Sequence, residues 1–151
     1  MSVVFGSLGG VGLLVSLALR WTDLVVVFQF DKTRHYYAGY ELYDRLGAPG
    51  GFLTASLAIA GLGAICASGN GNARLSLRCG VLALVTVAAG CLALMVVGPP
   101  ASSVGRGYTA IEPKLELGAM LAVVSAALCM AGGVLARRAA VTGWASVRTR
   151  A

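Results

Sequence analysis

The chain has 151 residues, of which 58% are hydrophobic and only 12% charged, and its mean hydropathy is +0.81. A soluble domain of this size buries only about 70% of the surface that its unfolded chain exposes, so this composition excludes an ordinary soluble fold. The formal net charge of +6 comes with no basic patch interleaved with aromatic residues, so we expect no nucleic-acid partner. The composition predicts an integral membrane protein.

Four apolar segments are long enough, as helices, to cross about 30 Å of hydrocarbon at about 1.5 Å per residue. Helices are expected because open strands would leave backbone groups unpaired in lipid. We therefore predict an all-α fold, a single domain over residues 1–151 that forms a membrane four-helix bundle of two transmembrane hairpins. The predicted helices cover residues 3–19, with an extension to 30 as an alternative, then 48–68, 79–98 and 115–137, before a cytoplasmic tail at 139–151.

The first apolar run could also be a secretory signal peptide, because Ser16-Leu17-Ala18 resembles a small-residue cleavage site. A signal peptide carries basic residues before its apolar run, whereas Arg20 follows this one. We expect the first helix to be retained.

With four predicted spans, both termini lie on the same side of the membrane, and the charged residues are distributed unequally between that side and the other. The side of the termini carries six arginines and no acid: Arg74, Arg78, Arg137, Arg138, Arg148 and Arg150. The opposite side carries six basic residues and all six acids: Asp23, Asp31, Glu41, Asp44, Glu112 and Glu116. Because the Arg137-Arg138 pair directly follows the last helix, we predict a multi-pass protein of the cell membrane with both termini in the cytoplasm.

The first outer segment combines an apolar stretch with most of the tyrosines. Residues 24–30 suit either a short strand or an extension of the first helix. Tyr36, Tyr40 and Tyr43 follow the spacing of one helical face, which predicts a short amphipathic helix at the membrane interface, with Glu41 beside it. The alternative is that these tyrosines line a ligand cleft. In the second outer segment, Pro113 suits the first turn of the last helix.

The sequence lacks the common motifs of catalytic and cofactor-binding sites. It contains no nucleophile elbow, phosphate-binding loop, CxxC pair or zinc-protease motif. The predicted spans also lack the midplane charge of ion-coupled carriers. We expect no enzyme, no cofactor and no metal site. An intramembrane enzyme would instead need convergent outer polar groups such as His35, Glu41, Asp44 and Glu112.

Small residues repeat at four-residue spacing in three of the predicted helices. Such stripes allow helix backbones to approach closely in lipid, so we predict that they form packing or partner contacts. The residues are Gly6 and Gly10 in the first helix, Ser56, Ala60 and Ala64 in the second, and Gly118, Ala122 and Ala126 in the fourth.

Several short motifs give the chain a resemblance to a group of proteins. The first helix exits through Leu19-Arg20-Trp21, Gly39-Tyr40-Glu41 precedes the second, and Leu117-Gly118-Ala119 opens the fourth. With the Arg-bearing loop before the third helix and the Ala-, Gly- and Arg-rich usage, the chain resembles the small, mostly uncharacterised four-helix membrane proteins of actinobacteria. The resemblance implies a fold and a source, and carries over no catalytic residue.

A chain so poor in polar chemistry is expected to act through contacts, made by helix packing and by four residues of the outer segment: Tyr36, Tyr40, Tyr43 and Glu41. We predict a non-enzymatic accessory or structural subunit of a membrane complex, with membrane lipids and other membrane subunits as partners and a homo-oligomer as an alternative assembly. The alternative function is a homo-oligomeric pore or small-solute transporter, lined by hydroxyl side chains: Ser16, Thr54, Ser56, Thr86 and Ser125.

Overall fold

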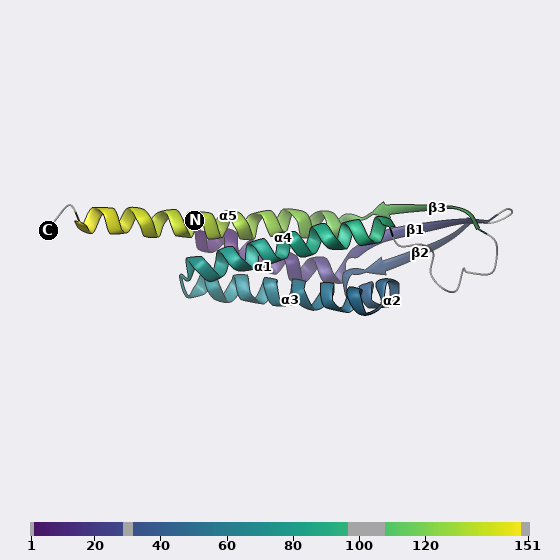
Figure 1. Ribbon diagram of the computed structural model, residues 1–151, viewed down its shortest axis with the longest axis horizontal. Coiled ribbons are helices and arrows are strands. Elements are labelled where there is room, and N and C mark those ends of the chain that lie inside the picture. The colour runs from purple at the N-terminus through teal and green to yellow at the C-terminus, as the bar shows by residue number, and fades with distance from the viewer. Residues whose placement is uncertain (1, 29–31, 97–107, 149–151) are drawn as a thin grey trace.

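The computed structural model describes residues 2–28, 32–96 and 108–148, which form an elongated helical bundle with a small sheet at one end (Figure 1). Each long helix packs against two others: α1 and α4 both contact α3 and α5. The predominantly helical class is confirmed. The long helices are α1 (Ser2–Ala18), α3 (Ala48–Gly69), α4 (Ala73–Val96) and α5 (Leu117–Arg148).

Three of the helices are long and apolar enough to cross a membrane: α3, α4 and the Leu117–Val141 part of α5. At about 1.5 Å per residue they measure about 33, 36 and 38 Å, whereas α1 measures about 26 Å. Bulky apolar side chains point outward from them. Phe52 on α3 is 75% exposed and Leu92 on α4 is 66% exposed. Water would disfavour such faces, whereas lipid accommodates them.

A tight turn joins α3 to α4. Gly71 adopts a left-handed backbone with φ of 65°, and the amide of Asn72 donates to the carbonyl of Ala67 at 2.9 Å. This is a helix C-cap that only glycine adopts without strain. The side chain of Asn72 then caps α4, because its Oδ1 accepts the amide of Leu75 at 3.1 Å. The three residues between the helices therefore end one and start the next.

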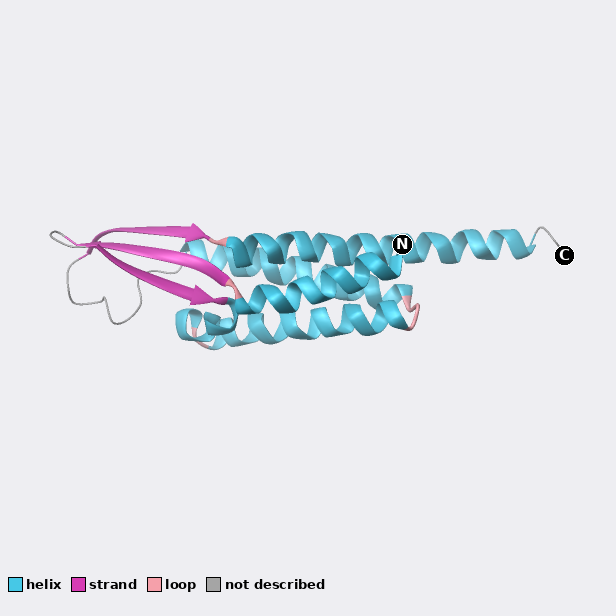
Figure 2. Cartoon of the chain, turned by 180° about the vertical axis from the view of Figure 1, so that it is seen from behind, coloured by secondary structure: helices cyan, strands magenta, loops and turns pink. Residues whose placement is uncertain are grey.

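The outer segments form a sheet, which corrects the interfacial helix predicted for the tyrosine segment (Figure 2). Strands β1 (Arg20–Phe28), β2 (Lys32–Ala38) and β3 (Tyr108–Leu115) pair antiparallel in the order β2-β1-β3. The β-branched run in β1 favours a strand over the alternative helix extension to residue 30. After β2, a 3-10 turn η1 (Gly39–Glu41) and a short helix α2 (Leu42–Leu46) lead back to the bundle.

Other boundaries also differ from the predicted ones. Helix α4 begins at residue 73 rather than 79, because Arg74 and Arg78 belong to its first turns. Helix α5 begins at 117 rather than 115 and continues to 148, through most of the segment predicted as a tail. The predicted end of the third helix at 97–98 lies outside the described residues. Helix α3 matches the predicted 48–68 to within one residue.

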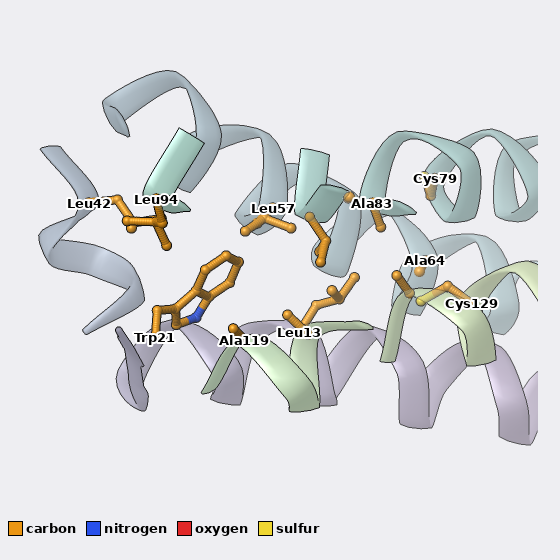
Figure 3. Packing of buried hydrophobic residues seen from close by; sticks show 14 residues of the cluster. Leu13, Trp21, Leu42, Leu57, Ala64, Cys79, Ala83, Leu94, Ala119 and Cys129 are labelled. Atoms are coloured by element: carbon orange, nitrogen blue, oxygen red, sulfur yellow. The ribbon is translucent and has the colours of Figure 1, made fainter. Parts of the chain in front are cut away.

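An apolar core runs along the bundle axis (Figure 3). At the sheet end, the ring of Trp21 points into the core, toward Leu57. Leu42 of α2 and Leu94 of α4 lie side by side near this ring. All four side chains are at most 1% exposed. At the opposite end the same cluster continues to Cys129 on α5. The described interior is therefore filled with packed side chains from one end to the other.

Candidate functional site

The most polar part of the described structure is one face of the outer sheet, which we call the charged face. It is built around Asp23 in the central strand, whose register partners are Tyr36 in β2 and Lys114 in β3. Residues directly opposite in an antiparallel ladder place their side chains on the same face of the sheet. Arg34 lies two residues from Tyr36 and shares that face because strand side chains alternate.

A bulge adds a further cation to this face. The pairing of β1 with β2 slips between Arg20 and Thr22, so Trp21 is the extra residue. A bulge of this kind inverts the alternation of side chains beyond it. Arg20 therefore lies on the charged face, with its guanidinium carbon 4.4 Å from the centre of the Tyr36 ring. This is a cation–π contact.

Asp23 is the unusual member of the charged face, because this carboxylate is only 7% exposed, whereas Arg20, Arg34 and Lys114 are exposed. Its Oδ1 atom is buried and accepts no hydrogen bond. An unsatisfied buried acceptor costs about 1–3 kcal/mol of stability. Groups retained at such a cost are typical of functional positions.

The described side chains of the charged face include three exposed cations, Arg20, Arg34 and Lys114, and the buried carboxylate of Asp23. Glu112 lies two residues before Lys114 and so belongs to the same face, and its side chain is outside the described part of the structure. The pKa of the Arg34 guanidinium is raised, first by its hydrogen bond with Tyr36 and then by the charges of Tyr36 and Asp23. Exposed guanidinium and ammonium groups beside an aromatic ring can bind an acidic group.

Trp21 fixes this face to the bundle. The indole is fully buried, and its Nε1 donates to the carbonyl of Ser16 near the end of α1 at 2.8 Å. The carbonyl of Trp21 accepts the amide of Glu116 at 2.9 Å, where β3 passes into α5. Gly118 packs so closely here that a Cβ atom would lie 2.6 Å from the carbonyl oxygen of Arg20. Strand β1 is thus bonded to two helices at its root.

The residues predicted as outer contacts surround this root. Tyr36 is 42% exposed on β2, and Tyr40 is 60% exposed in η1. Glu41 is half-buried and accepts the amide of Ala38 at 2.9 Å. Tyr43 belongs to α2, and its side chain lies outside the described part of the structure. Tyr36 and Tyr40 therefore belong to a strand and a turn rather than to one helical face, because β2 ends between them.

The small residues predicted for helix packing lie between the chain's own helices. Gly6 and Gly10 are buried, and a Cβ atom on Gly10 would lie 2.6 Å from the carbonyl oxygen of Gly61 on α3. Of the remaining positions, Ser56 is half-buried and the rest are buried: Ala60, Ala64, Gly118, Ala122 and Ala126. These stripes therefore bring α1, α3 and α5 together.

No cluster of three metal-ligating side chains occurs among the described residues. Of the outer polar groups considered for enzyme chemistry, Glu41 caps η1, Asp44 is exposed on α2, and the side chains of His35 and Glu112 are not described. The chain matches no protein-family model, no curated protein and no solved structure.

Sequence reasoning missed the charged face as a site. The signal was a period of two: Lys32, Arg34 and Tyr36 alternate with other residues along β2, as Glu112 and Lys114 do along β3. The spacing of Tyr36, Tyr40 and Tyr43 predicts a helix instead, because it matches a helical period. Asp23 has no local signal, because its burial arises only when β2 and β3 pair on either side of it.

Proposed function

We propose that this chain is a non-enzymatic subunit of a membrane complex and that the charged face of its outer sheet binds an acidic segment of another subunit. The observation that best supports this proposal is the attachment of the charged face to the helix bundle. Trp21 is fully buried between the helices, so Arg20, Arg34 and Lys114 are presented on a fixed support. Rigid presentation reduces the entropy lost on binding, which favours a recognition role.

The positions of the small residues favour a partner site on the sheet over one on the helix bundle. Gly6, Gly10, Ala122 and Ala126 already contact neighbouring helices of the same chain, so a partner does not need them. The exposed faces of α3 and α4 carry bulky residues such as Phe52 and Leu92. Lipid tails solvate such residues as well as a partner helix does, so these faces offer little specificity.

We further propose that the chain is a multi-pass protein of the cell membrane with its sheet outside and both termini in the cytoplasm. Helix α1 begins, and helix α5 ends, away from the sheet (Figure 1). The acid-free arginine cluster of the sequence belongs to that same end, as the positive-inside rule requires of a cytoplasmic side. A C-terminal fluorescent protein should therefore be bright and a C-terminal periplasmic phosphatase inactive. The opposite pair of results would invert the orientation.

The binding proposal is tested by purifying the chain in mild detergent with a C-terminal tag and measuring the mass of the intact complex. Arg34→Gln combined with Lys114→Gln removes two exposed cations from the charged face. Arg148→Gln combined with Arg150→Gln removes the same charge near the C-terminus. We expect a stoichiometric partner with the wild type and the C-terminal control, and its loss from the sheet variant.

Salt provides an independent check. Raising ionic strength from 0.1 to 1 M shortens the screening length from about 10 to 3 Å, so the wild-type complex should dissociate faster at high salt. A lone monomer or homo-oligomer in every preparation would contradict the proposal. Retention of the partner by the sheet variant would place the contact elsewhere. In either case, solute-flux and conductance assays in liposomes become the next measurement.

A further inference from the structure

A groove lies at the end of the bundle opposite the sheet. It has a volume of about 710 Å³ and is lined by the start of α4 and the distal part of α5: Ala73, Arg74, Leu77, Arg78, Arg137, Ala140 and Val141. A second groove of about 420 Å³ shares Leu77, Arg137 and Val141 with the first. The two grooves therefore meet around the same part of α5.

The course of α5 creates this groove. A Cβ atom on Gly133 would lie 2.7 Å from the backbone of Leu77, so α5 and α4 are in close contact at that level. Helix α4 begins at Ala73, whereas α5 continues alone beyond it to Arg148 (Figure 1). The groove therefore lies where the first turns of α4 meet the part of α5 that continues past them.

The lining combines cations with an apolar floor. Arg74 and Arg78 are one helical turn apart on α4, and Arg137 faces them from α5. Leu77 and Val141 lie among them, and Val141 is 64% exposed. Guanidinium groups bind phosphate oxygens in pairs of hydrogen bonds, and an apolar floor suits an acyl chain.

No acidic residue of this chain is near enough to neutralise these arginines. The sequence has no Asp or Glu between Asp44 and Glu112, and none after Glu116. Glu116 directly precedes α5 at the sheet end, and Arg137 lies 21 positions further along the same helix. At about 1.5 Å per residue this is about 31 Å, beyond the screening length of physiological salt. The counter-charge must therefore come from outside the chain.

We propose that this groove binds an anionic phospholipid, with the phosphodiester between Arg74, Arg78 and Arg137 and an acyl chain against Leu77 and Val141. The arginines lie within the two end turns of the candidate spans Ala73–Val96 and Leu117–Val141, where side chains of this length can reach the headgroups at a membrane surface. A free phosphate would satisfy the arginines but leave the apolar floor exposed. The site is independent of the outer sheet and of its proposed partner.

The test compares lipid binding to the purified full-length chain by native mass spectrometry. The probes are dioleoyl phosphatidylglycerol and dioleoyl phosphatidylcholine, which share their acyl chains and differ in charge. Arg74→Gln with Arg137→Gln should weaken phosphatidylglycerol binding about thirtyfold, because each basic residue near an anionic surface contributes about fivefold. The matched control, Arg148→Gln with Arg150→Gln, makes the same charge change at sequence positions beyond the lining residues and should bind as the wild type does.

Two further measurements separate a lipid site from simpler explanations. Val141→Asn leaves all arginines in place and should weaken phosphatidylglycerol binding without changing the effect of added inorganic phosphate. Equal losses in both arginine pairs would show diffuse charge attraction and overturn the proposal. Displacement of the lipid by low concentrations of inorganic phosphate, or no effect of Val141→Asn, would show a headgroup site only and would also overturn it.

Discussion

Substitution of Gly118 by alanine tests the close packing that attaches the sheet to the bundle. A Cβ atom at this position would lie 2.6 Å from the carbonyl oxygen of Arg20, 2.8 Å from Cδ1 of Trp21 and 2.9 Å from the carbonyl oxygen of Leu19. Two of these neighbours are backbone atoms and the third belongs to a rigid, fully buried ring, so none can move aside cheaply. Overpacking of this kind costs about 1–3 kcal/mol.

Gly69→Ala is the matched control. Gly69 also lies near a helix end, in the last turn of α3, and a Cβ atom there would meet nothing within 4 Å. Replacing a helical glycine by alanine gains about 0.5–1 kcal/mol where space is available. The control should therefore equal or exceed the wild type in stability, and the two variants should differ by about 1–3 kcal/mol in unfolding free energy.

The assay is equilibrium unfolding in detergent, followed by tryptophan fluorescence in a Trp144→Phe background, so that the signal comes from Trp21, which passes from a fully buried to a solvated environment. We expect the Gly118→Ala transition to shift to lower denaturant, with the Gly69→Ala transition unshifted or shifted upward. Equal stability of the two alanine variants would refute the reasoning. It would mean that strand β1 and helix α5 are not in the contact described here.

Three other substitutions probe the same end of the molecule. Thr54→Val removes a hydroxyl that donates to the Gly39 carbonyl at 3.0 Å, and should lower the unfolding free energy by about 0.5–1.5 kcal/mol in the same assay. Glu41→Gln should lower the pKa of the Tyr40 phenol, because the Glu41 charge and then its hydrogen bond raise that pKa; NMR titration of ring-labelled tyrosine measures it. Trp21→Phe keeps an aromatic ring but loses the N–H donor to α1, and should cost at least about 1 kcal/mol in thermal or chemical unfolding.

The helices could be predicted from the sequence because their signal is local. An uninterrupted apolar run with Pro49 in its first turn indicates α3 to within one residue. Where charges interrupt the pattern, the predicted helices are too short: Arg74 and Arg78 lie inside α4, and Arg138 lies inside α5. Arginine is a good helix former, and Arg137 is followed by a second arginine and two alanines, so helix propensity continues where hydropathy falls.

The sheet could not be predicted in the same way, because its pairing is not local. Strand β3 pairs with β1 across more than 80 residues of sequence, as Val25 opposite Glu112 illustrates. Pro113 matched the first turn of a helix equally well. In the structure it lies in an edge strand, where a missing backbone donor is tolerated. Whether Pro113 begins a helix or lies in a strand depends on pairing with β1, which is too far away in the sequence for a local pattern to reveal.

The internal use of small residues supports the proposal that other molecules bind at the two ends of this protein. In lipid, helices associate through close backbone contact rather than through a hydrophobic drive. This chain places its glycines and alanines at contacts such as Gly10 with Gly61 and Gly133 with Leu77, inside its own bundle. The outward faces retain bulky apolar side chains, which lipid solvates. We therefore place the proposed directional contacts with other molecules at the charged face around Asp23 and at the groove lined by Arg74, Arg78 and Arg137.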